Sequence, residues 1–168
     1  KLFNVYASNT TRDWIKPEEI RDIQGSWNML NGEAGPTRID ECTEERGWIV
    51  FTGMDFSKGD DLNGDAFLAY NTRTGDFFGD MDVYISEEAA NQSPIRELLY
   101  QWAAGGYITI VPGKTFEPSW PINRIKKLYD AGLYFGSYGY DPYNAATVVN
   151  ALSQWVFDEG FDPKQIVI

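Results

Sequence analysis

Apolar and aromatic residues gather in three short runs before the middle of the chain. The run 48–55 is rich in β-branched and aromatic residues and ends on Asp55, which predicts a buried strand that closes on a carboxylate. Two further strands are predicted at 65–71 and 76–85, and the turn residues of Asn71–Gly75 indicate a hairpin between them. This part of the chain therefore predicts an antiparallel meander.

Helical patterns alternate with short apolar runs in the second half of the chain. The first helix is predicted to begin at Ser93 and Pro94, with an inward face spaced at i, i+3, i+4 and i+7 that consists of Ile95, Leu98, Leu99 and Trp102. The later predicted elements are a strand at 107–111, a helix at 121–130, a strand at 134–140, a helix opening at Asp141–Pro142 and a strand at 165–168. This order is typical of an α/β protein with a mixed sheet and helices on its faces, and the ribonuclease H-like fold has it.

Residues 1–47 differ from the rest of the chain in their pattern. A short helix is predicted at 17–24, and residues 28–47 are rich in turn signals, so we interpret residues 1–47 as an N-terminal arm and connector. Residues 48–168 are then the folded domain. Because the chain starts at Lys1 without an initiator Met and ends on an apolar run, we expect it to be part of a longer protein that is truncated at its C-terminus.

The composition excludes several kinds of chemistry. The 168 residues include no His and a single Cys, so neither a Ser-His-Asp device nor a Cys-based zinc site is expected. No phosphate loop of the G-x-x-x-x-G-K type is present, so no ATP site is expected, and no apolar stretch is long enough to predict a membrane span. The net charge of −11 is unusual for a whole nucleic-acid-binding protein.

Two acids stand where predicted strands end. Asp55 closes the first strand, and Asp141 follows the strand at 134–140. If these strands are neighbours, the two carboxylates lie about 5 Å apart, which suits one or two hard cations such as Mg²⁺ or Mn²⁺. Each acid also has an ordinary structural interpretation, since Asp55 could simply start a loop and Asp141 is a good N-cap before Pro142.

The segment between the first two strands contains a third candidate. Residues 58–65 are rich in Asp and Gly, but an alignment on Gly64 puts Gly59 and Tyr70 where an EF-hand needs acids. We therefore predict a hairpin turn there, with Asp61 as an outer metal ligand.

Three stretches resemble the C-terminal nuclease domain of the large terminase subunit of tailed bacteriophages. They are Phe51–Ser57 with Asp61 and Leu62 after it, Trp102–Gly113, and Gly139–Ala146, and Trp14–Ile15 resembles the segment that leads in from the ATPase domain of that subunit. The resemblance implies a ribonuclease H-like fold and metal-dependent cutting of concatemeric double-stranded DNA when packaging starts and ends. By the family pattern, Asp55 and Asp141 are two of the metal-binding acids.

The same resemblance implies what surrounds the domain. Its partners would be DNA, the missing ATPase domain of the same subunit, the portal and the small terminase subunit, in the cytoplasm of an infected bacterium. The third acid of the family lies beyond the last strand of this chain, so the chain is expected to bind metal weakly and to cut DNA poorly.

The sequence is also compatible with two other classes of function. The abundant aromatic residues and acids are compatible with a carboxylate-pair glycosidase, which needs no cation, or with a non-enzymatic module that binds carbohydrate or protein. Metal-dependent DNA cleavage distinguishes the nuclease from both.

Overall fold

The computed structural model describes residues 35–57, 61–117, 119–141, 146–158 and 166–167. The chain divides into two compact units, Lys1–Thr37 and Arg38–Ile168, so the second unit begins earlier than the predicted boundary at residue 48. The helix predicted at 17–24 lies outside the described residues.

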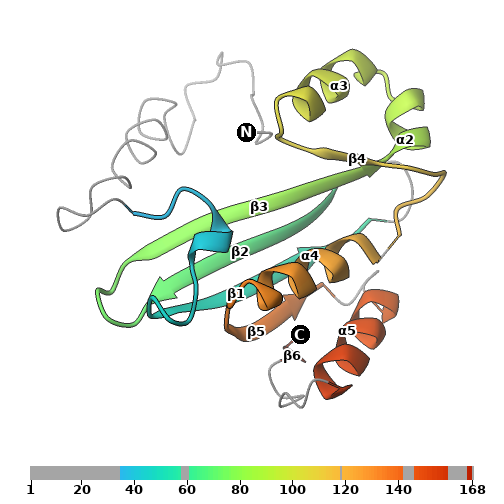
Figure 1. Ribbon diagram of the computed structural model, residues 1–168. Helices are drawn as coiled ribbons and strands as arrows, with labels where there is room; N and C mark the ends of the chain where they lie inside the picture. Colours follow the sequence, from blue (N-terminus) through green and yellow to red (C-terminus); the bar gives the residue numbers. More distant parts are fainter. Residues whose placement is uncertain (1–34, 58–60, 118, 142–145, 159–165, 168) are drawn as a thin grey trace, which may run out of the picture. The chain divides into compact units, whose positions relative to one another are not determined.

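The second unit is built on one six-stranded mixed sheet with the order β4-β3-β2-β1-β5-β6 (Figure 1). The strands are β1 (Trp48–Asp55), β2 (Asn63–Asn71), β3 (Phe77–Ser86), β4 (Thr109–Val111), β5 (Phe135–Tyr140) and β6 (Ile166–Val167). The first three strands pair antiparallel, while β4, β5 and β6 each join the sheet by parallel pairing. The predicted meander and mixed sheet are therefore confirmed.

Helices connect the later strands. They are α2 (Glu87–Gln92), α3 (Arg96–Ala104), α4 (Ser119–Asp130) and α5 (Ala146–Asp158), and a short 3-10 turn, η2 (Ile39–Glu41), precedes β1. Figure 1 shows α2 and α3 beside β4, and α4 lying along the sheet with α5 next to it. The helix α4 buries Ile122, Ile125 and Leu128, which confirms the predicted inward positions Ile122 and Ile125.

The pleat of the central strands separates two faces of the sheet. Buried and exposed side chains alternate along β1 and β2, as expected when successive residues point to opposite sides. The inner face carries Val50, Thr52 and Met54 of β1, which are all buried. The outer face includes exposed apolar residues such as Leu68 and Phe77.

The helix predicted to begin at Ser93 and Pro94 starts later, and an additional helix precedes it. Ser86 caps an earlier helix, α2, by accepting a hydrogen bond from the Ala89 N–H at 3.2 Å, and α3 starts only at Arg96. Two acids follow Ser86 in the first turn of α2, which favours a helix start there.

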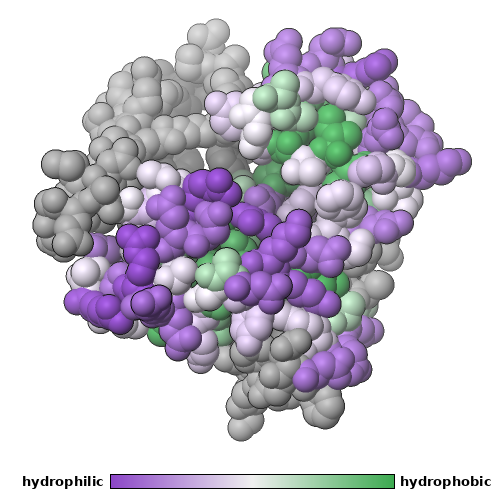
Figure 2. Space-filling model, viewed as in Figure 1, coloured by the Kyte–Doolittle hydropathy of each residue, from purple (hydrophilic) through white to green (hydrophobic). Residues whose placement is uncertain are grey.

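The predicted inward face of α3 is also only partly buried. Ile95 is 47% exposed and Leu98 40% exposed, whereas Leu99 is buried. Only part of the apolar face of α3 is covered by the rest of the fold, so the helical spacing of apolar residues predicted more burial for this helix than the structure has. Figure 2 shows hydrophobic surface beside α3 on an otherwise largely hydrophilic face.

Candidate metal centre at the ends of β1 and β5

The parallel pairing of β1 with β5 brings the two predicted strand-end acids to one edge of the sheet. Gly53 pairs with Gly139 and Met54 with Tyr140. The Asp141 N–H then donates to the Met54 carbonyl at 3.1 Å, which continues the parallel ladder by one residue, opposite Asp55. Neighbouring strands lie about 4.8 Å apart. Asp55 and Asp141 therefore lie at the ends of adjacent strands, which is the condition that the sequence set for a shared site, and their role as metal ligands stays a prediction.

Both acids are exposed, and the glycines two residues before them, Gly53 and Gly139, have different surroundings. Asp55 and Asp141 are exposed in the structure. A Cβ added to Gly53 would meet no atom within 4 Å, so the outer face is open just before Asp55. A Cβ at Gly139 would lie 3.2 Å from the Thr52 carbonyl oxygen, which indicates that β5 approaches β1 closely there.

The donor set at this edge fits a hard divalent cation only in part. Carboxylate oxygens are the ligands that Mg²⁺ and Mn²⁺ prefer, and Asp55 and Asp141 supply two such groups. Across the described ranges, no three His, Cys, Asp or Glu side chains gather as a metal site would require. The further ligands would therefore be water, substrate oxygens or groups outside those ranges.

Asp61 lies between β1 and β2 with an exposed side chain. Its carbonyl oxygen accepts hydrogen bonds from the Ser57 hydroxyl at 3.3 Å and from the Asn63 side-chain amide at 3.2 Å. The backbone of Asp61 is thus tied to both flanks of the hairpin. Its predicted role as an outer ligand is compatible with this position and stays a prediction.

A further carboxylate, Asp65, was not identified from the sequence. It lies on the inner face of β2 and is 0% exposed. Its Oδ1 accepts a hydrogen bond from the Thr52 hydroxyl of β1, while its Oδ2 has no hydrogen-bond partner among the residues that the structure describes. Burial raises the pKa of Asp65 to about 8; the hydrogen bond from Thr52 opposes this shift, and the charge of Asp82 adds to it. Asp65 is therefore a neutral acid at neutral pH.

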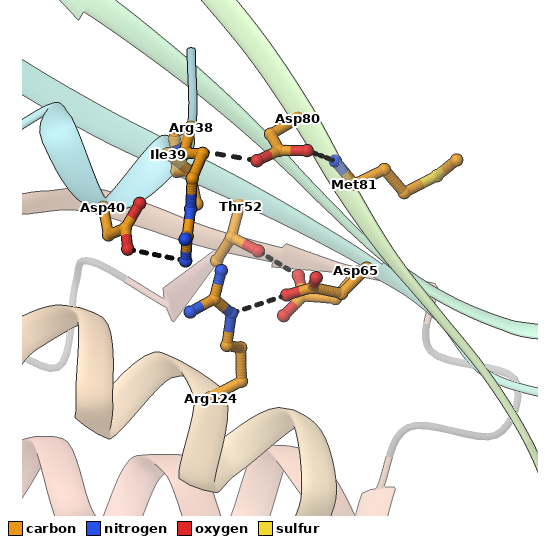
Figure 3. A network of polar contacts seen from close by, with 9 residues as sticks. Arg38, Ile39, Asp40, Thr52, Asp65, Asp80, Met81 and Arg124 are labelled. Atoms are coloured by element: carbon orange, nitrogen blue, oxygen red, sulfur yellow. Dashed lines mark hydrogen bonds and ion pairs between the residues drawn. The ribbon is translucent and has the colours of Figure 1, made fainter. Parts of the chain in front are cut away.

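The neighbour of Asp65 on β3 is charged and paired. Asp65 and Asp82 are directly opposite in the antiparallel register. Arg124 of α4 donates from Nε to Asp82 Oδ2 at 2.7 Å, and both side chains of this ion pair are partly buried. Figure 3 shows Arg124 reaching from α4 toward the strands that carry Thr52 and Asp65. This network fastens α4 to the inner face of the sheet.

The same inner face holds the segment before β1. The Ile39 N–H donates to Asp80 Oδ2 at 3.2 Å, and Asp80 Oδ1 accepts from the Met81 N–H at 2.9 Å. Asp80 therefore anchors η2 to β3, as Figure 3 also shows. These contacts are structural, because both carboxylate oxygens of Asp80 accept hydrogen bonds from backbone N–H groups.

The thiol of Cys42 is a poor nucleophile and a poor metal ligand. Cys42 is buried, and burial raises the pKa of its thiol to about 12, so the thiol is protonated.

Among the helices that the structure describes, none is both long enough and apolar enough to span a bilayer.

Comparisons with known proteins support the fold. No protein-family model matches the chain, and no curated protein matches it. Among solved structures, the chain is similar to the crystal structure of the HK97 bacteriophage large terminase, with a TM-score of 0.53 and 15% sequence identity. The match covers 73% of this chain and 24% of that chain, so this chain spans about a quarter of the terminase's length. At this identity the similarity shows the fold alone, which is α/β with a ribonuclease H-like mixed sheet.

Proposed function

We propose that this chain is the nuclease domain of a phage large terminase subunit and that it cuts double-stranded DNA with the help of Mg²⁺ or Mn²⁺. The observation that carries the proposal is the pairing of β1 with β5, because it sets Asp55 and Asp141 at one edge of a ribonuclease H-like sheet. The likeness in fold to the HK97 bacteriophage large terminase supports the proposal independently.

In this proposal the two acids hold the cation and the fold keeps their spacing. Asp55 and Asp141 would each offer carboxylate oxygens from the end of a strand whose backbone is fixed by the ladder. A bound cation would supply Lewis acidity and an activated water for attack on a phosphodiester. Asp61 would contact it through water, and Asp65 takes no part because it is buried on the inner face.

The proposed setting follows from the terminase assignment. The substrate is concatemeric DNA in the cytoplasm of an infected bacterium, and the partners are the ATPase domain of the same subunit, the portal and the small terminase subunit. The net charge of −11 means that this chain contributes little of the non-specific attraction to DNA. Other parts of the assembly would provide it.

Plasmid nicking with varied Mn²⁺ tests the proposal. We expect relaxed or linear plasmid to form with Mn²⁺ and to disappear with a chelator. Asp55→Asn and Asp141→Asn should each reduce cleavage at least about 100-fold, since an amide is a poor ligand for a hard cation. Asp76→Asn is the matched control, because Asp76 lies in the hairpin at the opposite end of β2.

The control should cleave as the unmodified chain does. Cleavage by Asp55→Asn at the unmodified rate would remove Asp55 from the mechanism. Chelator-resistant hydrolysis of a glycoside, with no nicking, would instead favour a carboxylate-pair glycosidase.

A further inference from the structure

Asn63 connects the two sides of the hairpin that follows Asp55. It is the first residue of β2, and it is 1% exposed. Its Oδ1 accepts from the Ser57 N–H at 2.9 Å, and its Nδ2 donates to the Asp61 carbonyl at 3.2 Å. One buried amide therefore satisfies a backbone donor just after β1 and a backbone acceptor just before β2.

The position of this amide relates it to the candidate metal centre. Ser57 is two residues beyond Asp55, and Asp55 itself pairs with Gly64, the residue after Asn63. The backbone on the carboxyl side of Asp55 is thus held by the Asn63 side chain, while the ladder holds the other side. Because a carboxylate follows its backbone, a change at Asn63 should move Asp55 without removing any ligand.

The far end of the same strand carries a similar arrangement. Asn71 is the last residue of β2 and is 6% exposed. Its Oδ1 accepts from the N–H groups of Arg73 and Thr74 at 2.9 and 3.2 Å, and its Nδ2 donates to the Arg46 carbonyl at 3.2 Å. Asn71 therefore connects the β2–β3 hairpin to the segment before β1, with as many backbone partners or more, but away from Asp55.

We propose that Asn63 is a positioning residue for Asp55, and that its side-chain amide sets the geometry in which Asp55 meets a divalent cation. This proposal rests on the proposed nuclease function, in which Asp55 holds the cation. Asn71 has the structural task alone. The two residues have the same side chain, on one strand, in comparable burial, so a comparison of them separates positioning from stability.

The experiment compares Asn63→Ala with Asn71→Ala in the full chain. Mn²⁺ binding is followed by electron paramagnetic resonance of the free ion, and plasmid nicking is measured over the same Mn²⁺ range. Both variants should lose similar stability in urea. Only Asn63→Ala should raise the Mn²⁺ concentration for half-maximal binding and nicking, by about tenfold, which is the usual effect of losing a group that orients a ligand. Its rate at saturating Mn²⁺ should stay within about threefold of the unmodified chain, because Asp55 remains.

A second variant keeps the test decisive if Asn63→Ala does not fold. Asn63→Asp retains the acceptor for the Ser57 N–H but loses the donor to Asp61. Asn71→Asp makes the same change at the other end of β2. A raised Mn²⁺ requirement in Asn63→Asp but not in Asn71→Asp would report the lost hydrogen bond, and equal requirements in the two variants would contradict the proposal.

The outcomes for positioning and for nuclease function are distinct. Equal Mn²⁺ requirements in Asn63→Ala and Asn71→Ala, with metal-dependent nicking intact, overturn the positioning role and leave the nuclease. An Asn63-specific loss of Mn²⁺ binding without any nicking by the unmodified chain supports positioning and overturns the nuclease. Absence of Mn²⁺ binding by the unmodified chain overturns both.

Discussion

Replacing Asp65 with Asn should remove a large part of the pH dependence of folding stability. Asp65 is 0% exposed, and burial raises its pKa from the ordinary value of 3.8 to about 8. Asn has nearly the same shape, carries no charge at any pH, and can keep a hydrogen bond with the Thr52 hydroxyl. The substitution therefore isolates the cost of ionising a carboxyl on the inner face.

The sign follows from counting protons. Between pH 4 and pH 8, roughly the two pKa values, the unfolded chain has released the Asp65 proton while the folded chain keeps it. Stability contributed by this carboxyl is thus fully present below the unfolded pKa and is lost as the pH rises toward the folded pKa. The slope is about −1.4 kcal/mol per pH unit, so the loss between pH 5 and pH 7 is about 3 kcal/mol.

The assay is urea unfolding at pH 5, 6, 7 and 8, followed by fluorescence of the 6 Trp residues. The unfolding free energy of the unmodified chain minus that of Asp65→Asn should fall by about 3 kcal/mol from pH 5 to pH 7. Asp130→Asn, a change at an exposed acid at the end of α4, is the control for general charge effects. A difference for Asp65→Asn that is constant from pH 5 to pH 8 would refute the neutral, buried acid.

Two other changes test neighbouring parts of the structure. Arg124→Ala should cost about 1 to 3 kcal/mol of unfolding free energy, because it leaves the partly buried Asp82 without its ion pair beside Asp65. Asp82→Asn in the same background should recover part of that loss, as a double-mutant cycle in urea would measure. Calorimetric titration of the chain with Mn²⁺ should give a dissociation constant well above about 1 μM, since two carboxylates carry too little charge to hold hard cations that keep their waters. Submicromolar binding would mean that residues outside the described ranges complete the site.

The sequence predicted the central strands well because their signal is local. Residues 48–55 form β1 with the predicted bounds, since the apolar run and the following turn residues identify both ends. The helix α2 was missed for the opposite reason. Its residues Glu87–Gln92 include only two alanines as apolar residues, so no periodic face indicates a helix, and the cap at Ser86 decides its start.

The candidate centre was predictable in its residues but not in its assembly. The sequence identified Asp55 and Asp141 as acids at strand ends, whereas their adjacency depends on β5 pairing with β1 across a long stretch of chain. Asp65 was missed because the predicted second strand began at Asp65 and not at Asn63. The face of the sheet to which its side chain points was therefore not predicted. The alternation of buried Asn63, Asp65 and Phe67 was the signal that could have revealed it.

Register is what gives Asp55 and Asp65 opposite chemistry. The two acids lie on paired strands, with Asp65 opposite Met54 and therefore one residue out of step with Asp55. The pleat sends Asp55 to the open outer face and Asp65 to the buried inner face, so one carboxyl is accessible to a cation and the other is kept neutral. A slip of β2 by one residue would exchange the faces of every β2 side chain and put Asp65 beside Asp55. The hydrogen bonds of Asn63 close the β1–β2 hairpin beside Asp55 and oppose this slip, so the amide that positions Asp55 also keeps the two acids apart.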